Sequence, residues 1–196
     1  MNRAKKDGIN FNGLYMYPIN SELGQVYYND MLWAIDYAEF NRFIIMKNTL
    51  KLLGLDIKNY IKDMINETHN HAILLPNNKL LHRKGATQAE KGIMGVIPAN
   101  MRDGVYITKG LGNAEFLSSA SHGAGRKFSR TQAKKVVDFD AVVNKLEELD
   151  IIVNITPKNS DENPGAYKDI KHVLKLQDGI VVDIIDHFIP KIVHIG

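Results

Sequence analysis

Apolar positions recur at helical spacing over a long stretch near the start of the chain. The positions that lie three or four residues apart are Leu23, Tyr27, Met31, Ile35 and Ala38, and this is the period of one helix face. Asn20 or Ser21 can cap such a helix, because either side chain accepts a hydrogen bond from a free backbone amide. Gly54 can end it. The pattern predicts a helix to about residue 53, with its Met, Trp and Tyr side chains in a hydrophobic core rather than in a cofactor site.

A second helical stretch is expected over residues 56–66, and beyond it the pattern changes to short apolar runs separated by Pro, Asn and Gly. Such runs predict strands. The segments expected are a short strand or turn at 14–18, strands at 72–75, 79–83, 93–97, 105–109, 151–155, 180–185 and 191–195, and helices at 130–137, 139–149 and 166–177. Residues 110–125 predict a long loop. Because strands and helices mix without strict alternation, we expect an α+β fold with packed helices and a mixed, largely antiparallel sheet.

Composition places the chain among ordinary globular proteins. It has 196 residues, of which 44% are hydrophobic and 24% charged, and a chain of this size can bury a core. The absence of cysteine excludes a disulfide scaffold, thiolate zinc sites and cysteine catalysis, and it suits a reducing compartment such as the cytoplasm. No apolar run approaches the roughly 20 residues that span a bilayer, so no membrane association is expected. Residues 1–13 are polar and predict a flexible arm before a domain over 14–196.

The net charge of +3 is unevenly distributed. Residues 79–135 contain eleven Lys and Arg but three Asp and Glu, a balance of +8, so the rest of the chain carries −5. This segment is a candidate surface for phosphates or nucleic acid. A solvated basic face without a ligand is the alternative that charge alone leaves open.

The most informative stretch places one histidine among small residues, from Ser118 to Arg126. Gly123 and Gly125 allow backbone amides to approach an anion, and Arg126 could clamp a phosphate. A neutral imidazole at His122 could then attack phosphorus. An incidental histidine in a flexible glycine loop is the alternative, and spacing alone favours it.

Two further segments carry candidate chemistry. His69 and His71 flank Asn70, and on an extended segment their side chains point to opposite faces, so at most one of them faces a given metal. Ordinary surface histidines are the alternative. Arg83 and Lys84 precede Gly and are suited to phosphate or backbone contacts. Neither a P-loop nor a dinucleotide-binding glycine motif is present.

Taken in order, these segments resemble the RtcB family of RNA-splicing ligases. The matching motifs are His69-Asn70, Arg83-Lys84-Gly85-Ala86, Val96 to Met101, Gly110-Leu111-Gly112-Asn113, and Ser121 to Arg126 followed by Ser129-Arg130. The resemblance runs from about residue 14 to the C-terminus, and it includes Asp161 to Ile170 and Gln177. This ordered set of motifs favours the chemical interpretations over the incidental ones.

The resemblance implies an enzyme that uses GTP and manganese to join an RNA 3′-phosphate, or 2′,3′-cyclic phosphate, to a 5′-hydroxyl end. It implies that His122 is the nucleophile that takes GMP, that His69 is a manganese ligand and that Asn70 contacts the nucleotide. The other implied guanylate contacts are Pro98, Ala99, Asn100, Met101, Gly123, Ala124 and Gly125. Lys84 and Arg126 are candidates for RNA or triphosphate oxygens.

The sequence also departs from the family pattern. The family's metal site uses an Asp, a Cys and three His, and all but one of these precede the segment that this chain matches. Ala99-Asn100 replaces Gly-Ser, Val105 replaces Ser, and Ile195 replaces a Lys that contacts guanine. We therefore expect a diverged C-terminal half of the ligase domain, incomplete without an N-terminal half that another chain could supply. The alternative is a non-catalytic remnant that binds RNA or a partner.

Overall fold

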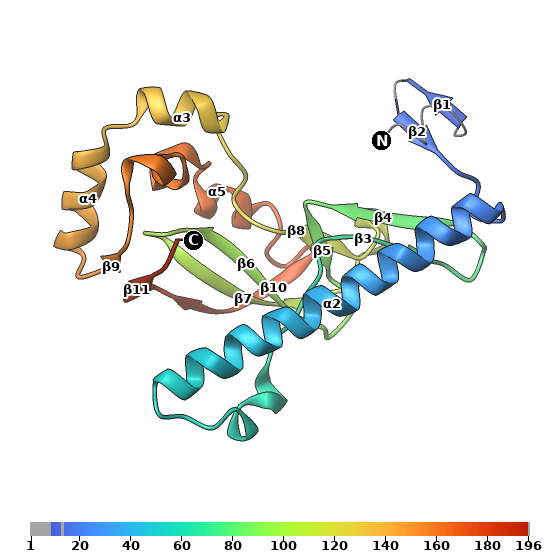
Figure 1. Ribbon diagram of the computed structural model, residues 1–196, viewed down its shortest axis with the longest axis horizontal. Coiled ribbons are helices and arrows are strands. Elements are labelled where there is room, and N and C mark those ends of the chain that lie inside the picture. Colours follow the sequence, from blue (N-terminus) through green and yellow to red (C-terminus); the bar gives the residue numbers. More distant parts are fainter. Residues whose placement is uncertain (1–8, 13, 196) are drawn as a thin grey trace. The chain divides into compact units, whose positions relative to one another are not determined.

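The computed structural model describes residues 9–12 and 14–195, and it divides into two units, Met1–Asn66 and Glu67–Gly196 (Figure 1). In the first unit, strand β1 (Ile9–Phe11) pairs antiparallel with β2 (Leu14–Met16). The flexible arm expected over 1–13 therefore lies mostly outside the described residues, and its remaining part includes a strand. The long helix α2 (Glu22–Leu52) follows.

Helix α2 begins and ends where the sequence predicts, but its side chains do not form a core. The Ser21 side chain accepts a hydrogen bond from the Gly24 amide (3.1 Å), and Gly54 follows the end of the helix with φ of +73°. Trp33 is 69% exposed and Tyr27 is 64% exposed. The expectation that these side chains are core is wrong for the described chain, because helical periodicity does not supply the surface that would cover them.

The helix expected over 56–66 is instead two short 3₁₀ helices, η1 (Ile57–Asn59) and η2 (Ile61–Asp63). The segment that follows is held against α2 by the Asn66 side chain, which donates to the Glu39 carbonyl (3.2 Å) and accepts from Arg42. The main-chain bonds of the two short helices run from each amide to the carbonyl three residues earlier, as from Tyr60 to Ile57 (2.9 Å) and from Asp63 to Tyr60 (3.0 Å).

The second unit is an α+β fold with mainly antiparallel strands, as the sequence predicts (Figure 1). The strands are β3 (Asn70–Leu74), β4 (Leu80–Lys84), β5 (Ala86–Gln88), β6 (Met94–Asn100), β7 (Gly104–Gly110), β8 (Ser119–Ser121), β9 (Ile152–Val153), β10 (Val182–Phe188) and β11 (Ile192–Val193). The helices are η3 (Ala114–Phe116), α3 (Arg130–Val136), α4 (Phe139–Glu148), η4 (Pro157–Glu162), η5 (Pro164–Ala166) and α5 (Ile170–Lys175). Strands β10, β7 and β6 form an antiparallel sheet, β3 pairs with β4 and β5 with β8, and β9 and β11 are parallel.

Several elements differ from their sequence expectation, including β5, which was not predicted, and β9 and β11, which are shorter than the strands expected at 151–155 and 191–195. The loop expected over 110–125 contains η3 and β8, and β8 pairs with β5. Both of these strands have three residues and few large apolar side chains, so periodicity gives no signal for them. The helix expected over 166–177 is limited to α5, because the Asp169 side chain caps it by accepting from the Lys171 amide. Strand β10 extends to Phe188, beyond the expected end at 185.

A buried apolar cluster joins the three-stranded sheet, α5 and the loop that carries His122. Its members are Ala89, Ile97, Ala99, Tyr106, Ala120, Ala124, Ile170, Leu174, Val181 and Val182. Because Ala120 and Ala124 flank His122 and are both 4% exposed, this loop is anchored in the core rather than free. No helix among the described residues is long and apolar enough to cross a membrane.

A second cluster forms around Met101, Leu146 and Ile151, and Ile195 packs against it. Ile195, which stands where the family has a Lys, therefore has an apolar environment in this chain.

The hairpin between β6 and β7 is closed by polar side chains. Asn100 Oδ1 accepts from the amides of Arg102 (3.0 Å) and Asp103 (2.9 Å), and its Nδ2 donates to Asp103 Oδ2 (2.8 Å). Arg102 Nε donates to Asp103 Oδ1 (2.7 Å). The hydrogen bond from Arg102, followed by the one from Asn100, holds the pKa of Asp103 below its usual value.

We predict that this carboxylate stabilises the fold in a pH-dependent manner. The pKa of Asp103 is lower folded than unfolded, so its contribution is present above the unfolded value of about 3.9 and is lost as the pH falls below it. Asp103→Asn should lower the free energy of unfolding by roughly 1 kcal/mol at pH 7, and by less at pH 3. Urea unfolding at both pH values measures this difference. Glu147→Gln, which changes an exposed carboxylate of α4, is the control, and an equal loss at both pH values would contradict the assignment.

Candidate functional site

The rings of His69 and His122 stack on each other, although 53 positions separate them in the sequence. Their centroids are 4.9 Å apart and their planes differ by 9°. His69 immediately precedes β3, and His122 immediately follows β8. The fold thus brings together the two histidines that the sequence singles out, at the ends of strands from two different pairs.

Gly85 connects the two strand pairs that carry these histidines. Its amide donates to the His69 carbonyl (3.0 Å) and to Asn70 Oδ1 (3.3 Å). The next residue, Ala86, pairs with Ser121, which precedes His122. Gly85 has φ of +67°, and a Cβ at this position would lie 3.3 Å from His122 Nε2. Glycine therefore serves both the backbone turn and the space beside the imidazole.

Arg83 is buried and holds β4 against the segment that leads to His122. Its side chain is 1% exposed and forms an ion pair with Glu90 (2.7 Å). It also donates to Ser119 Oγ (2.9 Å) and to the Ser118 carbonyl (3.1 Å). Of the two roles that the sequence left open for Arg83, the structure shows contacts with the protein backbone and side chains.

The environment of His122 favours its neutral form. Burial lowers the pKa of His122, and the neighbouring His69 lowers it further. A neutral imidazole keeps a nitrogen lone pair that can attack an electrophile. Gly123 follows His122 in the chain and lies close to Pro98, because a Cβ on Gly123 would be 3.0 Å from the Pro98 carbonyl oxygen.

The residues that were expected to contact the nucleotide differ in the solvent exposure of their side chains. Ala99 and Ala124 are each 4% exposed and Met101 is 8% exposed, with their side chains in the two apolar clusters. The Asn100 side chain closes the β6–β7 hairpin. For these residues, any contact with a nucleotide is therefore expected mainly through main-chain atoms. Pro98 and Gly125 are exposed, and the Gly125 carbonyl accepts from the Lys168 amide (2.9 Å).

A cavity of about 750 Å³ opens beyond the end of β6. Asn100 and Met101 line it, together with Tyr167, His194 and Ile195. Burial and the adjacent Glu162 raise the pKa of Tyr167 to about 12, so its phenol stays neutral. The end of β6 thus extends from the His122 loop at Pro98 to a cavity large enough for a nucleobase.

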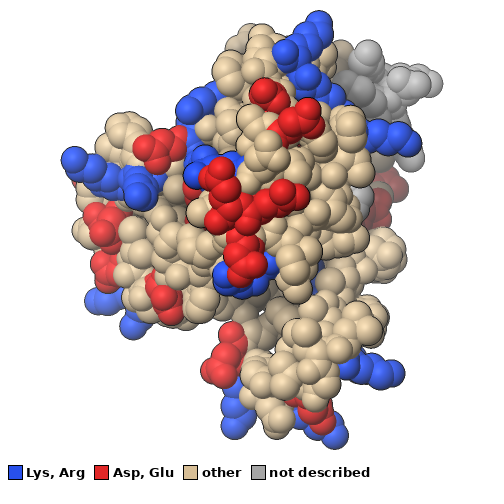
Figure 2. Space-filling view, turned by 90° about the vertical axis from the view of Figure 1, so that its left-hand side faces the viewer, with Lys and Arg blue, Asp and Glu red and all other residues tan. Residues whose placement is uncertain are grey.

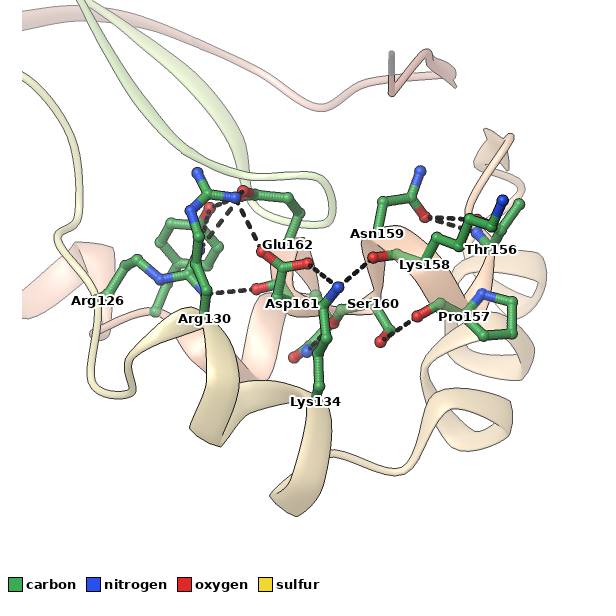
Figure 3. Close-up of polar contacts among 12 residues, drawn as sticks. Arg126, Arg130, Lys134, Thr156, Pro157, Lys158, Asn159, Ser160, Asp161 and Glu162 are labelled. Carbon is green, nitrogen blue, oxygen red and sulfur yellow. Dashed lines mark hydrogen bonds and ion pairs between the residues drawn. The ribbon is translucent and has the colours of Figure 1, made fainter.

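Arg126 is held by protein acceptors. It donates to the carbonyls of Asp161 (2.6 Å) and Phe128 (3.2 Å), and it contacts Glu162 at 3.3 Å. Figure 3 shows Arg126, Arg130 and Lys134 on the same side of η4. All three side chains lie near the carboxylates of Asp161 and Glu162. Arg130 and Lys134 lie 2.8 and 3.2 Å from Asp161, whose side chain is 7% exposed. The role of Arg126 in phosphate binding stays a prediction, and the contacts shown position the loop.

The fold neutralises part of the basic segment. Asp161 and Glu162 lie outside residues 79–135, yet they pair with three of its cations. The face drawn in Figure 2 accordingly has Lys and Arg interspersed with Asp and Glu. Lys84 is exposed at the end of β4, opposite Asn70 in the strand register. Of the two expected phosphate contacts, Lys84 is therefore the one whose charge is available beside the histidine pair.

The described residues do not make a manganese site by themselves. No group of three or more His, Cys, Asp or Glu side chains with a geometry for metal binding occurs among residues 9–12 and 14–195. His69 is the one ligand that the sequence resemblance implies here, and a single imidazole is insufficient for Mn²⁺, which prefers several oxygen and nitrogen donors.

We predict that the space beside His122 depends on Gly85. Gly85→Ala should cost about 1–2 kcal/mol of folding stability from its positive φ and should also displace the imidazole. Gly92→Ala is a matched control, because Gly92 has φ of +84° and no atom within 4 Å of a Cβ. Both variants should lose similar stability in urea unfolding, but only Gly85→Ala should shift the ring NMR signals of His122. Equal His122 signals in both variants would contradict this role.

Comparison with known proteins places this chain in one family. The family model described as tRNA-splicing ligase RtcB matches residues 1–194. The chain is 34% identical over 177 residues to RNA-splicing ligase RtcB1 of Escherichia coli (strain ATCC 25922), a match that covers 81% of this chain and 42% of that protein. It is 33% identical over 188 residues to tRNA-splicing ligase RtcB of Nanoarchaeum equitans, covering 81% and 39%.

The tRNA-splicing ligase RtcB of Methanococcus maripaludis is 32% identical over 203 residues, covering 88% of this chain and 42% of the relative. The chain thus spans about two fifths of the length of these curated relatives. The match over nearly all of its residues, together with the paired histidines and their glycine neighbours, establishes that the chain belongs to the RtcB family of RNA-splicing ligases.

Proposed function

We propose that this chain carries the nucleophile of an RNA ligase that joins a 3′-phosphate, or 2′,3′-cyclic phosphate, to a 5′-hydroxyl end with GTP. The observation that supports this most strongly is the position of His122, which stacks on His69 and lies beside Gly85. Membership of the RtcB family supports the reaction class. The end chemistry and the nucleotide come from the sequence resemblance.

The proposed reaction begins with the neutral imidazole. A ring nitrogen of His122 forms a bond to the α-phosphorus of GTP, and the bond to pyrophosphate breaks. A 2′,3′-cyclic phosphate is first opened by water, which breaks its bond to the 2′-oxygen and leaves a 3′-phosphate. An oxygen of the RNA 3′-phosphate then attacks the same phosphorus and releases the imidazole. Finally, the 5′-hydroxyl oxygen attacks the RNA 3′-phosphorus, its proton is lost to solvent, and GMP leaves. The lowered pKa of His122 suits the first step, because protonation would remove the attacking lone pair.

The cavity next to β6 is the proposed site of the guanine base. Asn100 and Met101 line it and belong to the segment that the resemblance assigns to guanylate. The adjoining Pro98 lies against Gly123 of the His122 loop, so one strand connects base and phosphate positions. Gly123, Ala124 and Gly125 would contribute main-chain atoms around the α-phosphate, and Asn70 would lie beside them through its contact with Gly85.

Manganese, which the resemblance also implies, needs ligands beyond the described residues. We propose that His69 contributes one imidazole and that an N-terminal half, supplied by another chain or region, contributes the rest. The exposed apolar side chains of α2 are consistent with a protein that functions together with a further partner.

A second candidate is a non-catalytic remnant that binds RNA or a partner. It is supported by Ile195, which lines the cavity and packs in the second apolar cluster where the family has a guanine-binding Lys. A lost hydrogen bond to a buried guanine edge costs roughly 1–3 kcal/mol. The intact His122 environment supports the catalytic proposal over this one.

We predict that GMP transfer from GTP labels His122. With GTP, Mn²⁺ and the N-terminal half of a full-length relative, mass spectrometry should find one GMP on the His122 peptide, and the adduct should be acid-labile and alkali-stable as a phosphoramidate is. His122→Ala should abolish labelling, whereas His172→Ala, which alters an exposed histidine of α5, should not. Labelling that persists in His122→Ala would remove the assignment, and its absence in the wild type would favour the non-catalytic candidate.

We also predict that Lys84 contributes to the salt dependence of RNA binding. For a single strand, each neutralised phosphate adds about −0.7 to the slope of log K against log salt concentration. Lys84→Ala should therefore flatten this slope by about 0.7 in a fluorescence titration with single-stranded RNA that ends in a 3′-phosphate. Lys175→Ala, which removes an exposed charge on α5, is the control. An unchanged slope for Lys84→Ala would place the RNA elsewhere.

A further inference from the structure

We infer that Gln177 is a positioning residue for His122 and acts through Ser121. The inference rests on the proposed role of His122 as nucleophile, but its geometry does not depend on GTP. Gln177 follows the C-terminal end of α5, and it lies 55 positions beyond His122 in the chain. Nothing in its local sequence indicates a contact with the histidine loop.

Both ends of the Gln177 amide bind the residue that precedes His122. Its Oε1 accepts from the Ser121 backbone amide at 2.8 Å, and its Nε2 donates to Ser121 Oγ at 2.7 Å. Nε2 also contacts the Val173 carbonyl at 3.2 Å, which fixes the orientation of the amide. Two hydrogen bonds to one residue restrain both its position and its rotation.

This restraint acts where the chain turns from β8 toward the imidazole. Ser121 is the last residue of β8, paired with Ala86, and the His122 side chain begins one peptide unit later. The ring must reach His69 on one side while it clears Gly85 on another. A small rotation at Ser121 therefore moves the attacking nitrogen, and misplacement by about 1 Å can cost about 100-fold in rate.

The fold around Gln177 does not depend on its side chain. The Gln177 carbonyl accepts from the amides of Val181 (2.8 Å) and Ile180 (3.1 Å), and these main-chain bonds hold the turn that follows α5. Leu174, one turn earlier in α5, is 3% exposed and anchors the helix in the core. Substitution of Gln177 should thus alter the contact with Ser121 while leaving the turn in place.

The first test measures GMP transfer to His122 by variants of residue 177, in the two-part system described above. Gln177→Leu should lower the maximal rate of GMP transfer between about 10-fold and 100-fold, with the KM for GTP within about twofold, because the nucleotide contacts are unchanged. Gln177→Glu keeps the acceptor for the Ser121 amide and lets Ser121 Oγ donate, but it loses the donor to the Val173 carbonyl, so it should restore part of the rate. Gln132→Leu is a matched control, because it removes a similar contact with Ser129 at the start of α3.

The second test needs no nucleotide. Hydrogen exchange of the Ser121 amide, followed by NMR on residues 1–196, should be slow in the wild type and in Gln177→Glu and should be fast in Gln177→Leu. A wild-type protein that fails to take GMP but shows this exchange pattern would remove the proposed function, while the hydrogen bonds between Gln177 and Ser121 would stand. Unchanged exchange together with an unchanged rate in Gln177→Leu would overturn the inference.

Ser121→Ala tests the same contact from the other side, in case Gln177→Leu misfolds. Ser121→Ala removes the Oγ acceptor but keeps the hydrogen bond from the backbone amide of residue 121 to Gln177 Oε1. It should therefore reduce the rate less than Gln177→Leu does. The effects of the two substitutions should be non-additive in the double variant, because both remove the hydrogen bond between Gln177 Nε2 and Ser121 Oγ. A wild-type rate in Ser121→Ala would contradict a role through its Oγ. Losses that add in free energy in the double variant would contradict a shared contact between the two residues.

Discussion

The contact between the imidazoles of His69 and His122 depends on a glycine that belongs to neither histidine segment. Gly85 donates its amide to the His69 carbonyl and leaves space beside His122 Nε2. Any side chain at this position would meet the ring at a backbone angle that L-residues rarely adopt. Gly85 lies between β4, which pairs with β3, and β5, which pairs with β8. The proposed chemistry of His122 therefore depends on the residue at this position.

Around this contact, charged residues serve mainly to hold the loops. Arg83 is buried between Glu90 and Ser119, and Arg126 is surrounded by the carbonyl of Asp161 and by Glu162. The buried guanidinium group of Arg83 needs such partners, because an unpaired charge is costly away from water. The basic character of the central segment therefore contributes first to structure, and Lys84 is the cation whose exposure suits a phosphate beside the histidines.

The sequence predicted those parts of the molecule whose signals are local. The bounds of α2 followed from the Ser21 cap and Gly54, and β6 and β7 followed from their apolar runs. The pair β5–β8 escaped prediction, because two three-residue strands of small side chains carry no periodicity and meet only through the tertiary fold. The candidate site was found from motif order, whereas the roles of Gly85 and Gln177 depend on contacts between distant segments that no spacing rule reveals.

The most direct test of the account is whether the two imidazoles touch in solution. In protein labelled with ¹³C in its histidines, nuclear Overhauser spectra should contain cross-peaks between the ring protons of His69 and His122, as stacked rings with centroids 4.9 Å apart require. The same cross-peaks should be absent in Gly85→Ala. A folded wild-type protein without them would contradict the arrangement on which the proposed nucleophile depends.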